Sequence, residues 1–470
     1  MMSYDKSMQK QTDRHILKDR IRRLNNKPTP DASSCVLYIM SRDMRLHDNF
    51  ALQVAQEQAL RLEVPLAVAF VLYPRSGTRA REHYRFMLDG LKEVEAGLAA
   101  KDVPFMLMLG KGEERIKGLL HHLKPQSLVF DFSPLRGPRK LHQVIAEHAS
   151  CPVVEVDTHN VVPVWKASDH QEIAARTLRP KINRLVPDYL EEARPLSKHP
   201  HAWPGTVKTI DDLSDMIERQ LADVPDNGSD ISRFKSGEKA ARKAMDDFLQ
   251  HRLKGYASQR NDPTQDGQSE LNPYFHYGQL SVATVVREIK QLDGRSGPSA
   301  EDADAFIEEA VVRKELSDNF CLYNDSYDKL SGAPEWARNT LDKHKTDARD
   351  FTYSRAQFEA AETHDEAWNA AQRQLVRSGK IHGYMRMYWA KKVLEWSNTP
   401  QGALETLLYL NDFYHIDGGD PNGYVGILWS IAGLHDRPWQ ERPVYGTVRS
   451  MVYNGLKRKF DIEAYIREWS

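Results

Sequence analysis

Strand-like and helix-like patterns alternate through the first third of the chain. Short runs of β-branched and other apolar residues recur at 35–40, 66–72, 105–109, 128–132 and 153–156. Stretches with apolar residues at helical spacing separate them, at 49–62, 81–100, 113–123 and 139–148. Strands that alternate with helices are typical of βαβ units and a parallel sheet covered by helices on both faces. We therefore expect a Rossmann-like α/β domain with a five-stranded parallel sheet, in which ligands bind at the carboxyl ends of the strands.

The pattern becomes polar and then purely helical in the second half. A stretch rich in Pro, Asn and Gly spans about 198–237 and leaves room for one helix near 213–221. Amphipathic helical segments follow at 238–254, 281–292, 302–323, 366–376, 381–396 and 402–412. The predicted organisation is a polar tail (1–30), an α/β domain (31–195), an interdomain linker (196–236) and an all-helical domain (237–470).

Composition excludes several broad classes of protein. Hydrophobic residues make up 40% and charged residues 28% of the 470 residues, and no apolar run approaches the length of a membrane span. The N-terminal tail is polar and basic and lacks the apolar core of a secretory signal. The three cysteines are too far apart for a metal or redox pair, which favours a reducing compartment. A net charge of −1 gives no indication of a polyanionic partner.

The charge is nevertheless unevenly distributed. The stretch 437–460 contains six basic residues and one acid, Glu441, a local excess of five positive charges. Trp439, Tyr445 and Tyr453 are interleaved with the basic residues. Cations that hold phosphates, combined with aromatic rings that stack on bases, are what nucleic-acid binding requires. A solvated charged face is the alternative interpretation.

Tryptophan is concentrated in the helical half, where seven of the nine lie after residue 330. Trp389 and Trp396 are seven residues apart in one predicted helix, which places them on one face about 10 Å apart along the axis. Core packing explains such a pair, and so does a chain of oxidisable indoles leading to a redox cofactor. Two polar, glycine-containing segments, 255–279 and 411–424, are either ordinary turns or places where backbone approaches a ligand.

Ordered motifs over most of the chain resemble those of the photolyase/cryptochrome family, specifically the class II cyclobutane pyrimidine dimer photolyases. The match is carried by the segments 40–43, 131–136, 157–163, 260–263, 315–320, 385–392, 417–424, 435–437 and 457–461. The resemblance implies an α/β antenna domain followed by a helical domain that binds FAD and DNA.

The same resemblance assigns cofactor positions. FAD-binding positions are expected at Tyr256, Ser269, Glu270, Leu271, Asn272, Gln279, Asn319, Arg386, Asp417 and Gly418. Arg386 and Asp417 would form the ion pair beside the isoalloxazine ring, and Asn411 would lie near flavin N5. Trp389, then Trp368, then Trp396 would be the path that carries an electron from the surface to the flavin.

Substrate positions follow in the same way. Glu309 would contact a flipped-out dimer, although its neighbour Glu308 leaves the register open by one residue, and Met387 and Trp429 would line the dimer pocket. Contacts to DNA are expected from Arg260, Asp436, Arg437, Trp439 and Arg449. The chain has Arg313 where some members of the family have Trp, which puts the shape of the dimer pocket in question.

The function implied is light-driven repair of cyclobutane pyrimidine dimers by electron transfer from excited FADH⁻, with a protonated Glu309 donating to a pyrimidine carbonyl. An antenna chromophore, a deazaflavin or a folate, is expected in the α/β domain. Damaged DNA is the expected partner, with no membrane and a monomeric protein, in the cytoplasm or nucleoid of a prokaryote or the nucleus or an organelle of a eukaryote. The alternatives are a cryptochrome-like flavin photoreceptor without repair activity, which the absence of a long tail after the last motif disfavours, and a non-enzymatic nucleotide-binding module.

Overall fold

A six-stranded sheet forms the centre of the N-terminal half in the computed structural model, which describes residues 17–31, 34–74, 79–292 and 298–470. Its strands are β1 (Ile21–Arg23), β2 (Val36–Met40), β3 (Leu66–Leu72), β4 (Phe105–Leu109), β5 (Ser127–Asp131) and β6 (Val153–Val156). They lie in the order β1-β6-β5-β2-β3-β4. The five predicted strands are present and pair in parallel, each within one residue of its expected bounds.

The sheet is mixed, however, so the prediction of a purely parallel five-stranded sheet is wrong in one respect. Strand β1 pairs antiparallel with β6 and lies inside the segment expected to be a tail. The hydrophobic pattern did not reveal this strand, because it has only three residues and two of them are arginine. Pairing places Arg22 opposite the buried Glu155, and the Arg22 Nε donates to Glu155 Oε1 at 2.5 Å. The ion pair therefore anchors a polar strand at the edge of the sheet.

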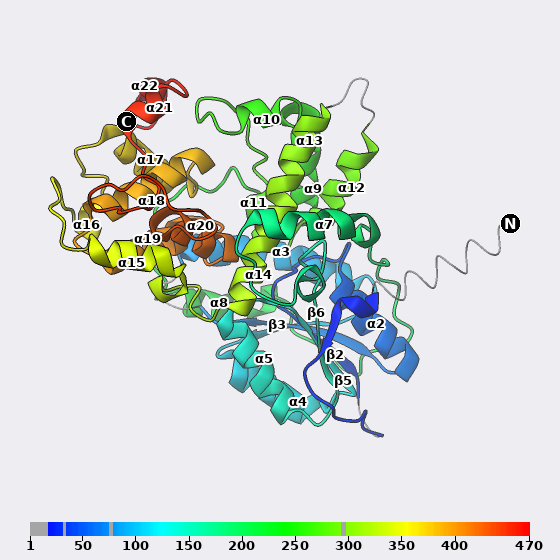
Figure 1. The fold of residues 1–470 in the computed structure, drawn as a ribbon. Helices are drawn as coiled ribbons and strands as arrows, with labels where there is room; N and C mark the ends of the chain where they lie inside the picture. The colour runs from blue at the N-terminus through cyan, green and yellow to red at the C-terminus, as the bar shows by residue number, and fades with distance from the viewer. Residues whose placement is uncertain (1–16, 32–33, 75–78, 293–297) are drawn as a thin grey trace.

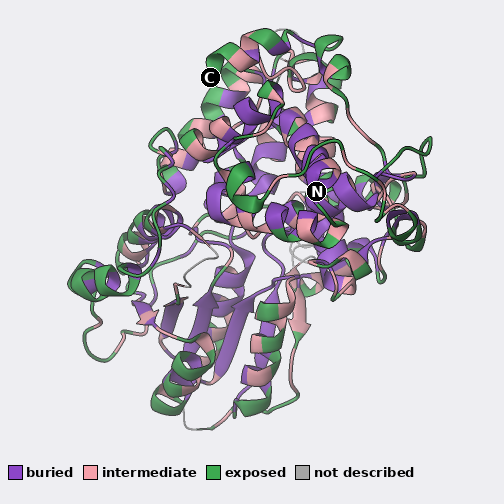
Figure 2. Cartoon of the chain, turned by 90° about the vertical axis from the view of Figure 1, so that its left-hand side faces the viewer, coloured by how far each residue is buried: buried purple, intermediate pink, exposed green. Residues whose placement is uncertain are grey.

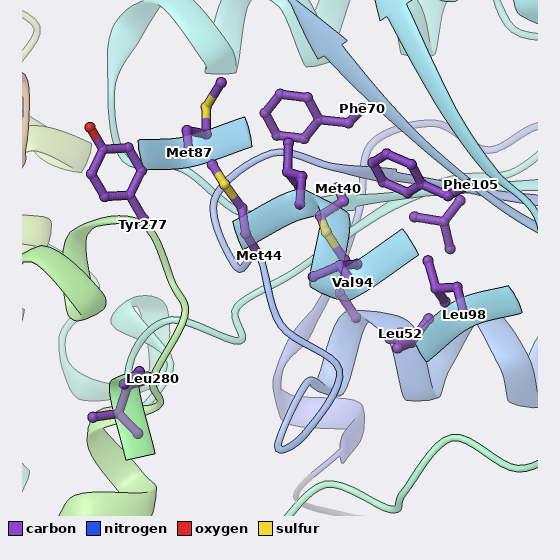
Figure 3. Packing of buried hydrophobic residues seen from close by; sticks show 14 of the residues in the cluster. Met40, Met44, Leu52, Phe70, Met87, Val94, Leu98, Phe105, Tyr277 and Leu280 are labelled. Atoms are coloured by element: carbon purple, nitrogen blue, oxygen red, sulfur yellow. The ribbon is translucent and has the colours of Figure 1, made fainter. Parts of the chain in front are cut away.

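Helices cover both faces of this sheet, as a parallel sheet requires. They are α2 (Phe50–Leu62), α3 (Arg81–Ala99), α4 (Gly112–Leu123) and α5 (Arg136–His148), followed by α6 (Val164–Ala167) and α7 (Ala175–Tyr189). All the strands except the edge strand β1 are almost entirely buried (Figure 2). Figure 3 shows Phe70 and Phe105 of the sheet packing toward Val94 and Leu98 of α3. Helix α7 was not expected, because Pro180 and Pro187 interrupt its pattern.

The second half is helical (Figure 1). The predicted linker contains η1 (Asp211–Leu213) and α8 (Ser214–Leu221). The helices that follow are α9 (Glu238–Asp247), η2 (Phe248–Arg252), α10 (Tyr256–Gln259), α11 (Asn272–His276), α12 (Val282–Gln291), α13 (Ala300–Ile307), η3 (Glu308–Arg313), α14 (Lys314–Tyr323), η4 (Leu330–Gly332), α15 (Glu335–Lys343), α16 (Arg355–Glu359), α17 (Glu366–Ser378), α18 (Gly383–Trp396), α19 (Pro400–Tyr414), α20 (Pro421–Ala432), α21 (Tyr453–Lys457) and α22 (Ile462–Glu468). Among the described residues, none of the helices is long and apolar enough to cross a membrane.

Buried charged groups join the two halves. Arg42, directly after β2, forms a two-bond ion pair with Asp318 of α14, with N–O distances of 2.8 and 2.9 Å. Glu315 of α14 accepts a hydrogen bond from the backbone N–H of Val161 at 2.6 Å. Asp131, at the end of β5, accepts bonds from the backbone N–H groups of Ser41, Arg42 and Asp43. Several of the family-like motifs therefore fix the helical half against the carboxyl edge of the sheet.

Candidate functional site

A cavity of about 270 Å³ lies where the helical half meets the α/β half. Six of the predicted site residues line it: Tyr256, Ser269, Asn272, Glu309, Arg386 and Asp417. Other lining residues were not predicted: His159, Phe275, His276, Phe306, Ala310, Arg313, Lys314, Asp420, Asn422 and Gly423. Most of these lie within or beside the sequence segments described above, so closeness in sequence to a motif could have identified them as lining residues. His159 is the contribution of the α/β half.

Glu309 faces the cavity from a π-helical turn, η3, between α13 and α14. Its carboxylate lies 3.0 Å from Arg260 Nη1, and 41% of its side chain is exposed. Its neighbour Glu308 is instead paired with Arg179 at 2.7 Å and with Arg313 at 2.9 Å. Of the two glutamates, Glu309 is therefore the one that faces the cavity, and its contact with a dimer stays a prediction. π-Helical turns occur frequently at functional sites.

Arg386 organises the opposite side of the cavity. Its guanidinium lies 3.6 Å from Asp417 Oδ1 and donates a short hydrogen bond to the side-chain carbonyl of Asn411. The Asn411 amide then donates to Asp412 Oδ1 at 2.7 Å. Burial raises the pKa of Asp412, although these hydrogen bonds to its charged form oppose the shift. The expected ion pair is thus present, and Asn411 lies in the same hydrogen-bonded cluster.

His415 connects this cluster to the tryptophans. It is fully buried, its Nδ1 lies 3.8 Å from Asp417 Oδ1, and its ring packs edge-on against Trp389 at 6.4 Å. Burial, with the charge of Arg386 added, holds the pKa of His415 well below its usual range, so the imidazole stays neutral.

The three predicted tryptophans form a buried series. Trp368 Nε1 donates to the backbone carbonyl of Trp389 at 2.9 Å, and the Trp368 ring lies 6.2 Å from that of Trp396. Trp396 packs against the exposed His364. Trp389 is therefore the end near the cavity and Trp396 the outer end. The prediction placed Trp389 at the surface end of the path, whereas the structure places Trp396 there, so the order from surface to cofactor is reversed.

Two predicted cofactor residues lie away from the cavity. The Gln279 side chain is buried and bonds Ser236 and the backbone N–H of Gly237, so it holds the start of α9. Asn319 is also buried, and it bonds the backbone of Glu172 and His170. In each of these amides the oxygen accepts one hydrogen bond and the nitrogen donates one. Neither residue lines the cavity, and their contact with the cofactor stays a prediction.

Three other predicted cofactor residues, Glu270, Leu271 and Gly418, also lie outside the lining of the cavity. Glu270 does not line the cavity, because its carboxylate pairs with Lys380 at 2.6 Å and with Arg233 at 3.5 Å. Leu271 is completely buried in the core. At Gly418, an added Cβ would lie 2.8 Å from the Asn411 carbonyl oxygen, so glycine permits the close approach of this loop to α19.

The predicted DNA contacts gather mainly in the segment 433–449, which we call the gripping loop. Trp439 is 40% exposed, and the guanidinium groups of Arg449 and Arg437 lie 4.6 and 5.4 Å from its ring centroid. Asp436 accepts a hydrogen bond from Trp439 Nε1 at 3.3 Å. The loop thus presents an aromatic ring flanked by two cations. Trp429 and Met387 are half-buried on α20 and α18 and do not line the cavity.

The residues around the cavity fit a flavin nucleotide. Tyr256, Phe275 and Phe306 supply apolar and aromatic walls for planar rings, while Arg386 and Lys314 supply cations for phosphate or an anionic ring. Gly423 allows close approach, since an added Cβ would lie 2.9 Å from the Asn411 amide nitrogen. Asp417 Oδ1 is buried without a hydrogen bond, which leaves an acceptor for a ligand donor. Among the described residues, no cluster of His, Cys, Asp and Glu suits a metal ion.

A second, larger cavity of about 840 Å³ opens at the carboxyl ends of β2 and β3. Its lining includes Met40, Leu72, Lys111, Leu141, His142 and Tyr277. This is the edge of a parallel sheet at which ligands bind. The cavity is mainly apolar with a few cations at its margin.

Comparisons with known proteins agree with this arrangement. The DNA photolyase family matches residues 36–201. Deoxyribodipyrimidine photo-lyases from rice (Oryza sativa) and from Potorous tridactylus are 46% and 42% identical to this chain; the matches cover 92% and 94% of it and 86% and 82% of those proteins. The relative from Methanothermobacter thermautotrophicus is 37% identical, covering 95% of this chain and 97% of that protein.

Solved structures share the fold. A class III photolyase from Agrobacterium tumefaciens superimposes with a TM-score of 0.73 at 18% identity, covering 94% of this chain and 87% of that one. A cryptochrome from Synechocystis gives 0.69 at 14% identity, covering 94% and 89%. The structural likeness extends to both branches, whereas the relatives of high sequence identity are photo-lyases. With such identity over more than nine-tenths of its length, the chain belongs to the DNA photolyase family.

Proposed function

We propose that this protein is a deoxyribodipyrimidine photo-lyase, which uses light to split cyclobutane pyrimidine dimers in DNA. The observation that carries the proposal is that one cavity is lined both by Glu309, the carboxylate expected to contact the substrate, and by the Arg386–Asp417 ion pair, expected beside the cofactor. The names of the relatives with high identity support the same activity.

FAD would be held by the residues that line the smaller cavity. Tyr256, Ser269 and Asn272 approach it from one side, and Arg386 and Asp417 from the other. When bound and fully reduced, the flavin supplies the photoexcited electron that opens the cyclobutane ring and is afterwards returned. The Arg386 guanidinium would stabilise the anionic state of the cofactor, and Asp417 and Asn411 would hold Arg386 in place.

Glu309 would recognise the dimer. Its carboxyl group reaches the cavity from η3 and is held there by Arg260. Once DNA phosphates compete for Arg260, Glu309 is released to hydrogen-bond a pyrimidine carbonyl, donating in its protonated form as negative charge develops on the dimer. The Glu308–Arg313 pair beside it would shape the rim of the pocket at the position where some relatives have Trp.

The gripping loop would hold the duplex while the dimer is extruded. Arg437 and Arg449 would bind phosphates, and Trp439 between them would fill or flank the gap left by the extruded bases. Trp429 and Met387 would contact the dimer on its way to the cavity. A damaged, weakly paired site costs less to open, which contributes to selectivity.

Repair of a dimer-containing oligonucleotide tests the proposal. The reduced protein is expected to remove dimers under near-ultraviolet or blue light and not in darkness. Undamaged oligonucleotide and Glu309→Ala serve as controls. A flavin-containing protein that leaves dimers intact in light would instead be a photoreceptor, and a colourless protein would contradict both.

We further propose that the larger cavity binds an antenna chromophore with a planar conjugated ring. Its apolar walls and marginal Lys111 suit such a ring carrying an anionic tail. Purified protein would then show an absorption band beyond those of the flavin, and Leu141→Trp, which fills the cavity, would remove that band without lowering flavin content. We also propose that the protein acts as a monomer, which its sedimentation with and without DNA would test.

A further inference from the structure

A lysine lies buried against Trp429, one of the residues proposed to contact the dimer. Lys391, in α18, has no exposed surface. Its Nζ donates to the Ser430 carbonyl oxygen at 2.8 Å and lies 4.7 Å from the ring centroid of Trp429. In the described part of the chain, no carboxylate lies within ion-pair distance of this Nζ. The next residue, Lys392, differs because its Nζ pairs with Glu395 at 2.5 Å.

A buried cation without a carboxylate partner is unfavourable for folding. Desolvation of an ammonium group costs several kcal/mol, which one carbonyl and one aromatic face compensate only in part. A methionine of similar length would fill the same space without that cost. The position is therefore occupied at the expense of stability, which is typical of a group that serves binding or chemistry.

We propose that Lys391 is a positioning residue for the dimer pocket: its ammonium group holds one face of the Trp429 indole, leaves the half-buried remainder for the extruded dimer, and makes dimer binding sensitive to pH. This inference rests on the proposed function, in which Trp429 contacts the dimer. A cation held under the ring also attracts the negative charge of DNA.

The charges around Lys391 set the direction of the pH effect. The pKa of Lys391 is lowered to about 7, chiefly by burial; Asp436 of the gripping loop acts to raise it, and Arg449 of the same loop acts to lower it. Helix α20, which packs against α18, has no charged residue. Phosphates drawn toward the loop when the dimer is extruded would raise the pKa of Lys391, so binding of dimer-containing DNA takes up a proton beyond any taken up with undamaged duplex. Affinity for dimer-containing DNA is therefore highest below about pH 6.5 and falls as the pH rises to 8.5.

The experiment measures the dissociation constant of dimer-containing and undamaged duplex from pH 6 to pH 8.5 at constant salt. For the unsubstituted protein, dimer affinity is expected to weaken about 3- to 10-fold over this range beyond the change for undamaged DNA. Lys391→Met removes that extra pH dependence and weakens binding at pH 6. Lys391→Arg restores tight binding and stays flat, because guanidinium remains charged throughout. Lys392→Met, the matched control, keeps the slope.

A purely structural role for Lys391 would leave the slope unchanged in Lys391→Arg, and that result would overturn the inference. So would an unaltered slope in Lys391→Met, or no effect of pH on the quenching of Trp429 fluorescence by dimer DNA, measured as the difference from Trp429→Phe. If Lys391→Met does not fold, the arginine variant still decides the question. Loss of the proposed function is recognised separately, by the absence of light-dependent repair at every pH.

Discussion

The indole nitrogen of Trp368 donates a hydrogen bond to the backbone carbonyl of Trp389 at 2.9 Å, which fixes α17 to α18 through the two tryptophans. Trp389 Nε1 in turn donates to Gln372 Oε1 at 2.8 Å. Both acceptors are neutral groups that cannot take up a proton at ordinary pH. An electron hole on either ring would therefore not be trapped by loss of the indole proton, and the series is suited to passing a charge outward to Trp396.

Removing the middle ring should break this series. Trp368→Phe is expected to slow photoreduction of oxidised flavin at least about tenfold, because the gap between Trp389 and Trp396 is no longer bridged by an indole. Repair by chemically prereduced enzyme should stay near normal. The two rates are followed by flavin absorbance and by dimer loss. Trp203→Phe, in the linker, is the control; equal photoreduction in the two variants would exclude Trp368 from the path.

Neighbouring glutamates offer a matched pair of substitutions. Glu309→Gln should lower the yield of repair several-fold with flavin content unchanged, because an amide is a weaker hydrogen-bond donor than a carboxyl group to an oxygen on which negative charge develops. Glu308→Gln breaks the pairs with Arg179 and Arg313 and should mainly lower stability, by about 1 kcal/mol or less for half-exposed groups. Repair yield and melting temperature are measured for both. A larger loss of repair in Glu308→Gln than in Glu309→Gln would show that Glu308, and not Glu309, contacts the dimer.

The strands and the division into two halves could be predicted because they depend on local patterns. The strands β2 to β6 are buried on both faces and are therefore predominantly apolar. Strand β1 could not be found in this way, since an ion pair between Arg22 and Glu155 holds it in place and the partner is more than 130 residues away.

The residues of the site were predicted by resemblance, and the structure distinguishes those that face the cavity from those that support it. Gln279 and Asn319 belong to motifs of the right kind, yet their amides satisfy buried backbone groups. A sequence does not reveal this difference, because both uses require a hydrogen-bonding side chain. Lys391 shows the converse: both lysines are buried, and Lys392 differs mainly in having Glu395 as its partner.

Arg386 should control retention of the cofactor. Arg386→Met removes the contacts to Asp417 and Asn411 and leaves the Asp417 carboxylate without its cation. The purified variant is expected to contain less than about half the flavin of the unsubstituted protein, measured as flavin absorbance per protein. Arg373→Met, which removes a surface pair with Glu366, is the control. Full flavin content in Arg386→Met would show that the pair is structural only.

The gripping loop should bind DNA mainly through charge. Arg449→Gln removes one of the two guanidinium groups over Trp439 and should weaken binding of any duplex, reducing the slope of log affinity against log salt by about 1. Arg219→Gln, on α8, should leave the slope unchanged. Titrations at several salt concentrations give both values. If the affinity falls with no change in slope, Arg449 acts by supporting Trp439 rather than by binding phosphate.

Glu315 should make the stability of the interface between the halves depend on pH. Burial raises the pKa of Glu315 to about 8, so the folded protein keeps this carboxyl group protonated where the unfolded chain ionises it. Its stabilising contribution is present below about pH 4.5 and is lost as the pH rises to about 8, at up to about 1.4 kcal/mol per pH unit. Glu315→Gln keeps an oxygen to accept from the backbone of Val161 and cannot ionise. We expect the variant to be no more stable than the unsubstituted protein at pH 5, because its amide nitrogen gains no partner where Glu315 Oε2 has none, but to lose less stability by pH 8. Denaturant unfolding at each pH measures the difference, with Glu301→Gln on α13 as control, and parallel curves for the two proteins would refute a buried, protonated Glu315.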